Sequence, residues 1–226
     1  MSYRGQRSIP SKDETSIILQ RYNAAQAHNL IYTLEELREL GIEPDFLMTL
    51  LEVFEDTDEF NPKDFNSFKL SVIVDYLRKT HRYYLEKKLP EIEQSIHLLS
   101  KAYPESHPIL QLLHDFYIDY AKHLTKHIEV EERELLPYIL DLEHLGSKGG
   151  NKGVVQKFIE EHHDTEKDLE EVRKAILHYS PPEDNQTLYR ILLSQLQVLE
   201  KDLAVHALIE DDVLLPRALE MEKQNR

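Results

Sequence analysis

Cysteine is absent from this chain of 226 residues. Its absence excludes disulfides, thiolate nucleophiles, cysteine-bound zinc and iron–sulfur clusters held by cysteines of this chain. Any metal must therefore be bound through nitrogen and oxygen. Such a ligand set suits iron, manganese or zinc better than a metal that prefers soft ligands.

Basic residues are few, and long apolar runs are missing. The chain has 27 Lys and Arg against 42 Asp and Glu, which gives a net charge of −15. This balance argues against nucleic acid and anionic membranes as partners. No apolar run approaches the roughly 18 residues of a membrane span, and no apolar stretch follows the first residues as in a signal peptide. We therefore predict a cytoplasmic protein.

Glycine is also scarce, and its positions help to divide the chain. Four of the six glycines lie within residues 146–153, which we predict to be a loop. Proline-containing breaks lie at residues 104–108 and 180–182. The four segments between these breaks have helical periodicity, and short links between long helices are typical of an all-α up-down four-helix bundle. The segments are residues 66–102, 108–144, 154–179 and 184–222. Pro90, Pro137 and Pro216 are expected to kink or end their helices.

The region before the bundle has a different character. Residues 1–13 form a polar tail, and residues 14–60 contain two shorter helical patterns. The first includes the capping box of residues 33–36 and stops at Gly41, and the second begins after Pro44. The acidic stretch 55–59 lacks the residue pattern of a calcium-binding loop. We therefore predict an N-terminal helical segment over residues 1–62 and the bundle over residues 63–226.

One motif occurs twice, 79 positions apart. Residues 127–137 and 206–216 share the frame H-x3-E-x3-L-L-P, which places His127 and Glu131 in one copy and His206 and Glu210 in the other. A histidine and a glutamate four residues apart lie on one face of a helix. Two such turns facing each other would provide two nitrogen and two carboxylate ligands. This repeat predicts a metal site.

Histidine also interrupts the apolar stripes of the other two long helices, at His81 and His162. A buried glutamate needs a compensating charge, and a metal cation supplies one. The predicted ligands are His81, His127, Glu131, His162, His206 and Glu210. His123, one turn before His127, is a spare ligand or a neighbour of the ligands. Phe116 and Ile159 are expected on the inward stripes of their helices.

These residues resemble the hemerythrin-like superfamily over residues 66–222, and the chain is most similar to the Repair of Iron Centres group of di-iron proteins. The resemblance is carried by residues 74–81, by the two H-x3-E motifs and by Glu161-His162. It implies two non-haem irons per chain. It further implies that His127, Glu131, His162, His206 and Glu210 are iron ligands, with the two glutamates bridging.

The chain departs from that group in three places. Arg82 stands where the repair proteins have a ligand histidine, while His81 lies one residue earlier on the inward stripe. Tyr103 stands where they have a further histidine, and a phenolate can bind ferric iron. The cysteine-bearing N-terminal segment of the repair proteins is also absent. These departures bear on the repair activity more than on the metal site.

Three functions remain open at this point. The first is a di-iron protein that binds or senses O2, NO or peroxide, or supports the repair of iron–sulfur proteins under oxidative or nitrosative stress. The second is a peroxidase or oxidase at the same site, with Tyr84, Tyr120 and Tyr138 as proton or electron donors or simply as core residues. The third is a metal-poor bundle that serves as a protein-interaction module. The sequence leaves both enzymatic activity and oligomeric state undecided.

Overall fold

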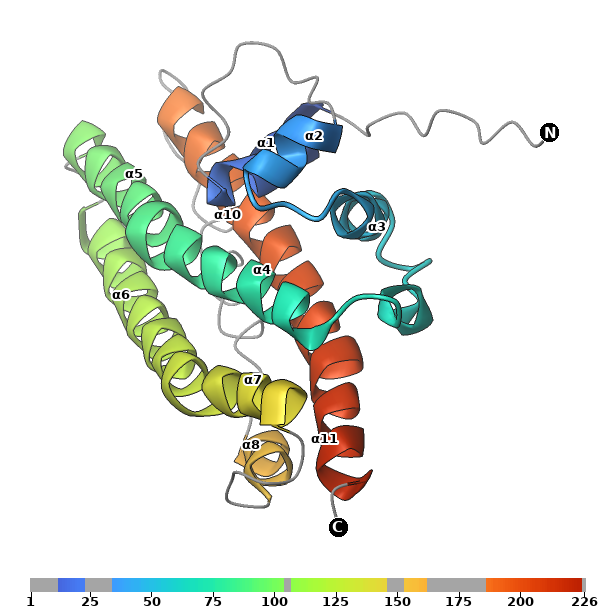
Figure 1. Ribbon diagram of the computed structural model, residues 1–226. Coiled ribbons are helices and arrows are strands. Elements are labelled where there is room, and N and C mark those ends of the chain that lie inside the picture. Colours follow the sequence, from blue (N-terminus) through green and yellow to red (C-terminus); the bar gives the residue numbers. More distant parts are fainter. Residues whose placement is uncertain (1–11, 23–33, 104–106, 146–152, 162–185, 225–226) are drawn as a thin grey trace.

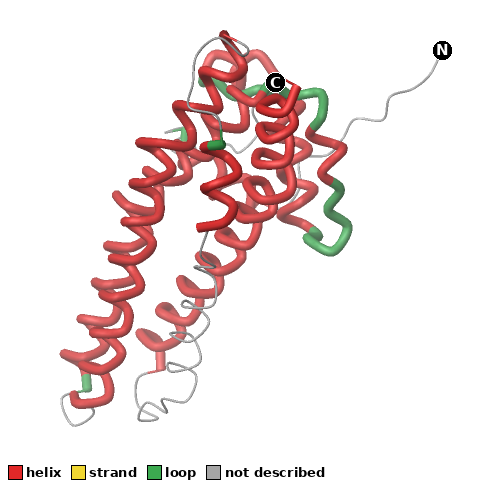
Figure 2. Tube along the Cα trace, turned by 90° about the horizontal axis from the view of Figure 1, so that it is seen from below, coloured by secondary structure: helices red, strands yellow, loops and turns green. Residues whose placement is uncertain are grey.

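The computed structural model describes residues 12–22, 34–103, 107–145, 153–161 and 186–224, and it contains helices and loops but no strand in these ranges (Figure 1). The all-α prediction is confirmed. Three long helical rods run side by side in both views of the chain (Figures 1 and 2). Helix α8 (Val154–Glu161) begins the remaining predicted helix. The rest of that helix, including His162, lies outside the described residues.

Each rod consists of two α-helices joined by a π-helical turn. The first rod comprises α4 (Leu70–Tyr83), η2 (Tyr84–Lys88) and α5 (Leu89–Ala102). The second comprises α6 (His107–Val130), η4 (Glu131–Leu135) and α7 (Leu136–Leu145). The third comprises α10 (Gln186–Ala207), η7 (Leu208–Leu214) and α11 (Leu215–Gln224).

The π turns explain how the rods accommodate Pro90, Pro137 and Pro216. A proline inside an α-helix has no N–H and collides with the carbonyl four residues earlier. Here each proline follows a leucine whose N–H bonds to the carbonyl five residues back, for example Leu136 to Glu131. The same bond joins Leu89 to Tyr84 and Leu215 to Glu210. The α-helical register ends before each proline, as expected, but the rod continues beyond it.

The N-terminal part has three described helices where two were expected. Helix α1 (Lys12–Arg21) precedes α2 (Leu34–Glu39) and α3 (Pro44–Glu55). The predicted stop after α2 is present at Gly41, which has φ 74°. Buried residues of all three helices belong to the same apolar cluster as buried residues of the bundle. The domain division at residue 62 stays a prediction, although these helices pack directly on the bundle.

The apolar interior of the bundle falls into two clusters that meet at the π turns. One contains buried side chains of α4, α7 and α11, together with the N-terminal helices. The other contains those of α5, α6 and the first part of α10. Two side chains expected in the interior are instead exposed. Phe116 is 53% exposed, because the face that α6 buries runs through Leu113 and Tyr117 instead. Ile159 on α8 is 39% exposed, whereas Val155 of the same helix is buried.

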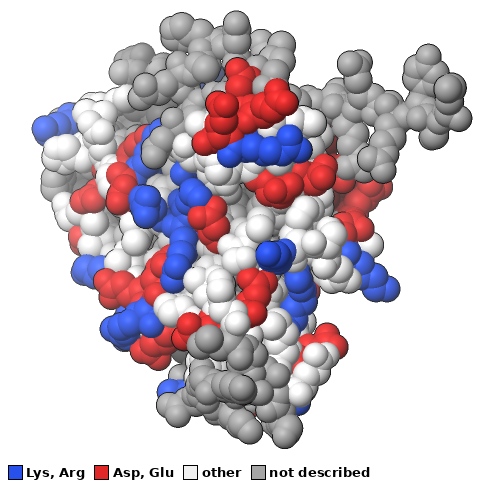
Figure 3. Space-filling view, viewed as in Figure 1, with Lys and Arg blue, Asp and Glu red and all other residues white. Residues whose placement is uncertain are grey.

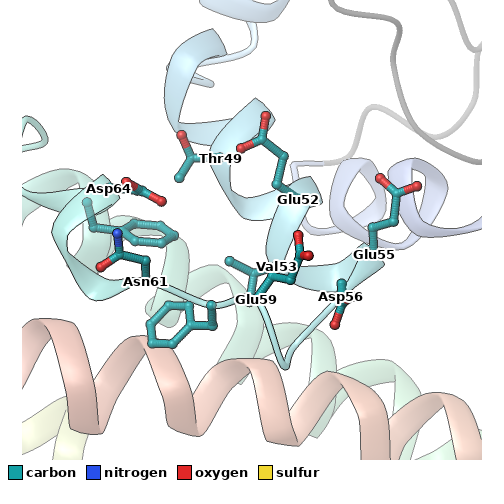
Figure 4. A pocket seen from close by; sticks show the side chains of 10 residues that line it. Thr49, Glu52, Val53, Glu55, Asp56, Glu59, Asn61 and Asp64 are labelled. Carbon is teal, nitrogen blue, oxygen red and sulfur yellow. The ribbon is translucent and has the colours of Figure 1, made fainter.

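The acidic stretch after α3 lines a pocket with residues of η1 (Pro62–Phe65). Its carboxylates point in different directions and do not converge on one point (Figure 4). Asp56 instead accepts a hydrogen bond from the N–H of Asp58, at 2.9 Å. The acidic stretch thus lies around the pocket without forming a single cluster of carboxylates.

The face shown in Figure 3 carries charged side chains of both signs. Among the described residues of that face, basic and acidic side chains are interspersed. Among the described helices, none is long and apolar enough to cross a membrane.

The start of α4 provides a test of the packing between rods. The Glu143 carboxylate on α7 accepts hydrogen bonds from the N–H groups of Leu70 and Ser71, at 2.6 and 3.1 Å. We expect Glu143→Ala to lower the free energy of unfolding by about 1 kcal/mol at neutral pH, because it removes the cap of α4. Urea denaturation measures this change, with Asp141→Ala on the exposed face of α7 as the control.

The same cap predicts a pH dependence. Burial alone would raise the pKa of Glu143, but the hydrogen bonds from Ser71 and Leu70 outweigh it and lower the pKa. A depressed pKa contributes stability above the unfolded value of about 4.3, and this contribution is lost as the pH falls through the folded value. The difference between wild type and Glu143→Ala should therefore shrink below about pH 4. An unchanged difference at low pH would contradict this assignment.

Candidate metal centre

The π turns place chemically important residues at one level of the bundle. Tyr84, Glu131 and Glu210 each lie five residues before a Leu-Pro pair, so they occupy equivalent positions in the three rods. All three side chains are buried. Single π turns inside α-helices often occur at functional sites. This level also separates the two apolar clusters, so it forms a polar layer inside the bundle.

His81, Glu131 and His206 form the first group of potential ligands, although they come from three different rods. Nε2 of His81 lies 3.0 Å from Oε2 of Glu131 and 3.4 Å from Nε2 of His206. All three side chains are buried. Two imidazole nitrogens this close together, with a carboxylate oxygen beside them, form a suitable set of donors for a cation.

His127, Glu131 and Glu210 form the second group. Oε1 of Glu131 lies 2.5 Å from Nε2 of His127. Oε2 of Glu210 lies 3.5 Å from Nε2 of His206, so Glu210 also reaches toward the first group. Glu131 belongs to both groups and offers one oxygen to each. His127 is the most exposed of these ligand candidates, at 16% of its side chain, and its ring faces Phe158 of α8.

The hydrogen bonding of these groups fits a bound cation. Both carboxylate oxygens of Glu131 are buried, and their close polar contacts are the imidazoles of His81 and His127. Oε1 of Glu210 and Nδ1 of His206 are buried and have no hydrogen-bond partner among the described residues. Buried polar atoms are nearly always satisfied, and an unpaired buried carboxylate is costly. Carboxylate and imidazole donors without thiolates match iron, manganese or zinc.

The electrostatics of the two groups are coupled. Burial disfavours the charged form of His81, but its contacts with Glu131 and Glu132 outweigh burial and raise its pKa to about 9. The pKa of His127 is also raised against burial, by Glu131. Burial alone would raise the pKa of Glu131, but the two imidazoles hold it well below its usual range. Glu131 is therefore ionised at neutral pH and can bind a cation.

Glu132 orients the imidazole of His81. Its Oε1 lies 2.8 Å from Nδ1 of His81, and its Oε2 lies 3.2 Å from Nε of Arg78. A metal would have to displace the proton from Nε2 of His81, and the carboxylate at Nδ1 would then hold the tautomer in which Nε2 binds the metal. The sequence analysis does not predict this role for Glu132, although an acidic residue directly after a predicted ligand is visible in the pair Glu131-Glu132. Arg82 is exposed, which agrees with the choice of His81 as the inward residue.

Five of the six predicted ligands are thus brought together, and His162 lies outside the described residues. Tyr103 is not brought to this cluster. It is the C-cap of α5, and 22 residues of nearly continuous helix separate it from His81, which corresponds to about 33 Å. His123 is exposed on α6 and belongs to neither group.

Known proteins show similarity to the same part of the chain. The family model described as "Hemerythrin HHE cation binding domain" matches residues 72–218, which contain all the predicted ligands. The chain belongs to the hemerythrin HHE cation-binding family. The predicted resemblance is thereby confirmed, and the bundle is a hemerythrin-like bundle.

Three relatives of this chain share 21 to 26% of its residues over the matched regions. The iron–sulfur cluster repair protein ScdA of Staphylococcus haemolyticus is 21% identical over 142 residues, which are 63% of this chain and 64% of that protein. ScdA of Staphylococcus epidermidis is 23% identical over 163 residues, 72% of this chain and 71% of that protein. The iron–sulfur cluster repair protein YtfE of Cronobacter sakazakii is 26% identical over 161 residues, 71% of each chain. The chain thus spans just under two thirds of the length of the first of these relatives.

The sharing of Glu131 between both groups leads to a prediction about this hemerythrin-like site. We expect Glu131→Gln to remove binding of metal at both groups, because it withdraws the charge and one oxygen from each. Elemental analysis of the purified protein measures the loss. Glu129→Gln, on an exposed position of α6, is the matched control. A Glu131→Gln protein that retains its full metal content would contradict the arrangement.

Proposed function

We propose that this protein binds two non-haem irons per chain. In this proposal it uses them to bind O2, NO or peroxide, or to support the repair of iron–sulfur proteins under oxidative or nitrosative stress. The observation that carries the proposal is the position of Glu131, whose two oxygens each lie beside a histidine of a different group. A carboxylate in this position is suited to bridge two cations. The names of the ScdA and YtfE relatives support the link to iron–sulfur repair.

Bound iron would supply a redox-active centre with a coordination position for a small ligand. The protein would supply the ligands and their negative charge, and it would keep bulk water away. The first group would hold one iron through His81 and His206, and the second would hold the other through His127. Glu131 and Glu210 would contribute the negative charge. The two apolar clusters on either side would keep bulk water from the site.

The test is to express the protein in iron-replete cells and to measure iron per chain together with the visible absorption spectrum. We expect about two irons per chain, and a spectral change when NO or peroxide is added anaerobically. Iron transfer to a damaged iron–sulfur protein, measured by recovery of that protein's activity, then tests the repair role. A folded protein that takes up no iron in these cells would overturn the proposal and favour the interaction-module alternative.

Tyr84 favours a second candidate function, a peroxidase or oxidase at the same site. Its ring lies 5.9 Å from that of His206, and its buried hydroxyl has no hydrogen-bond partner within the part of the chain that the structure describes. Burial raises the pKa of Tyr84 well above its usual value, so the phenol keeps its proton. Tyr138 instead donates a hydrogen bond to Glu222, at 2.7 Å. The ring of Tyr84 thus packs on that of a predicted ligand.

This candidate predicts the behaviour of Tyr84→Phe. If the protein is a peroxidase that uses the phenol, the variant should keep its iron and lose at least tenfold in turnover with hydrogen peroxide. Steady-state kinetics with a chromogenic reductant measure the rate, and Tyr138→Phe is the control. A stoichiometric colour change without turnover in the wild type would instead support sensing or storage.

A further inference from the structure

Arg21, the last residue of α1, inserts its guanidinium into the interior of the bundle. The side chain is completely buried, and it pairs with the buried carboxylate of Asp202 on α10. The guanidinium also lies over the rings of Phe54, Tyr76 and Tyr83, at 5.0 to 5.7 Å from their centroids. Burial disfavours the charge, but Asp202 outweighs it and keeps the pKa of Arg21 above its ordinary value.

The two arms of the guanidinium contact two different rods. Nη1 donates to the hydroxyl of Tyr76, at 2.5 Å, and to Oγ1 of Thr80, at 2.9 Å, both on α4. Nη2 donates to Asp202 on α10. The guanidinium is planar and rigid, so its contacts fix the distance and the angle between the groups that they join. Arg21 therefore ties α4 to α10.

Both ends of this connection are next to predicted metal ligands. Thr80 directly precedes His81, and Asp202 lies one helical turn before His206. Nε2 of His81 and Nε2 of His206 lie only 3.4 Å apart, and each comes from a different one of the two joined rods. A small slide or rotation between α4 and α10 would separate these nitrogens. A metal site tolerates errors of only about 0.5 Å in its ligands.

We propose that Arg21 is a positioning residue for the His81, Glu131 and His206 half of the metal centre, and that α1 is therefore part of the frame of that centre. The inference rests on the proposed two-metal site. The Arg21–Asp202 pair has no net charge, so its effect on a cation is geometric. The His127 half lies mainly on the second rod, which Arg21 does not contact through any hydrogen bond or ion pair among the described residues.

The central variant is Arg21→Met combined with Asp202→Leu. Removing only one partner would leave a buried charge unpaired and would be strongly destabilising, whereas replacing both is often tolerated. Thermal unfolding checks the fold, and anaerobic titration with Co2+ and Fe2+ measures the affinity of each metal equivalent. We expect one equivalent to weaken by about 10- to 100-fold while the other changes little, as for other residues that orient ligands. The control is Lys122→Ala with Asp119→Ala, an exposed ion pair on α6.

Two further variants keep the test decisive if the double variant does not fold. Thr80→Val keeps the shape and the ion pair, but it removes the contact beside His81. Arg21→Lys keeps the positive charge but loses the planar, rigid guanidinium that bonds to both rods. Both should weaken the same single equivalent, and by less than the double variant does.

The outcomes separate this inference from the proposed function. If wild type binds two equivalents and every folded variant binds them as wild type does, Arg21 does not position the ligands. The same conclusion follows if both equivalents weaken equally in step with the melting temperature, because the role is then purely structural. A wild-type protein that binds neither Co2+ nor Fe2+ would overturn the proposed function and this inference together.

Discussion

Two buried carboxylates between the apolar clusters of the bundle are the constraint on which the arrangement of the rods depends. The side chains of Glu131 and Glu210 lie inside the bundle, and their close polar contacts are with imidazole nitrogens of His81, His127 and His206. Such groups are tolerated only where a compensating positive charge is available. The rods are therefore arranged around one layer of histidines and glutamates, with separate apolar clusters above and below it. The apolar clusters stabilise the fold, and the layer between them holds the groups that could bind a cation.

A second charged contact, between Arg21 and Asp202, supports that layer from one side. This contact gives the N-terminal helices a structural role in the bundle. The sequence places them in a separate segment before the bundle, but in the structure Arg21 of α1 bonds to residues of two rods. The side chain of Arg21 is therefore part of the interior of the bundle. The His81 half and the His127 half of the centre are thus held by different means, and we expect them to respond differently to change.

Much of this could be predicted from the sequence, because its strongest signals are local. A histidine and a glutamate four residues apart, repeated before Leu-Leu-Pro, predict two turns that carry metal ligands without any knowledge of the fold. Helical periodicity is also a local signal, and it favours His81 over Arg82 as the residue that faces the interior. The rest depends on long-range contacts. Arg21 and Asp202 are 181 positions apart, and no pattern links them. Phe116 shares the period of the buried stripe yet is exposed, since a stripe fixes a face of α6 only to within one residue.

The π turns also affect how the three rods are compared with one another. A π turn adds one residue to a helix without adding a turn, so it rotates everything after it by about 100° relative to an uninterrupted α-helix. Counted back from the Leu-Pro pairs, His127 and His206 are nine residues away, but His81 is only eight, and Thr80 occupies the equivalent place. Matching the rods at their Leu-Pro pairs would therefore set Thr80, and not His81, beside the two histidines, and a shift of one residue in the first rod brings the three imidazoles into register.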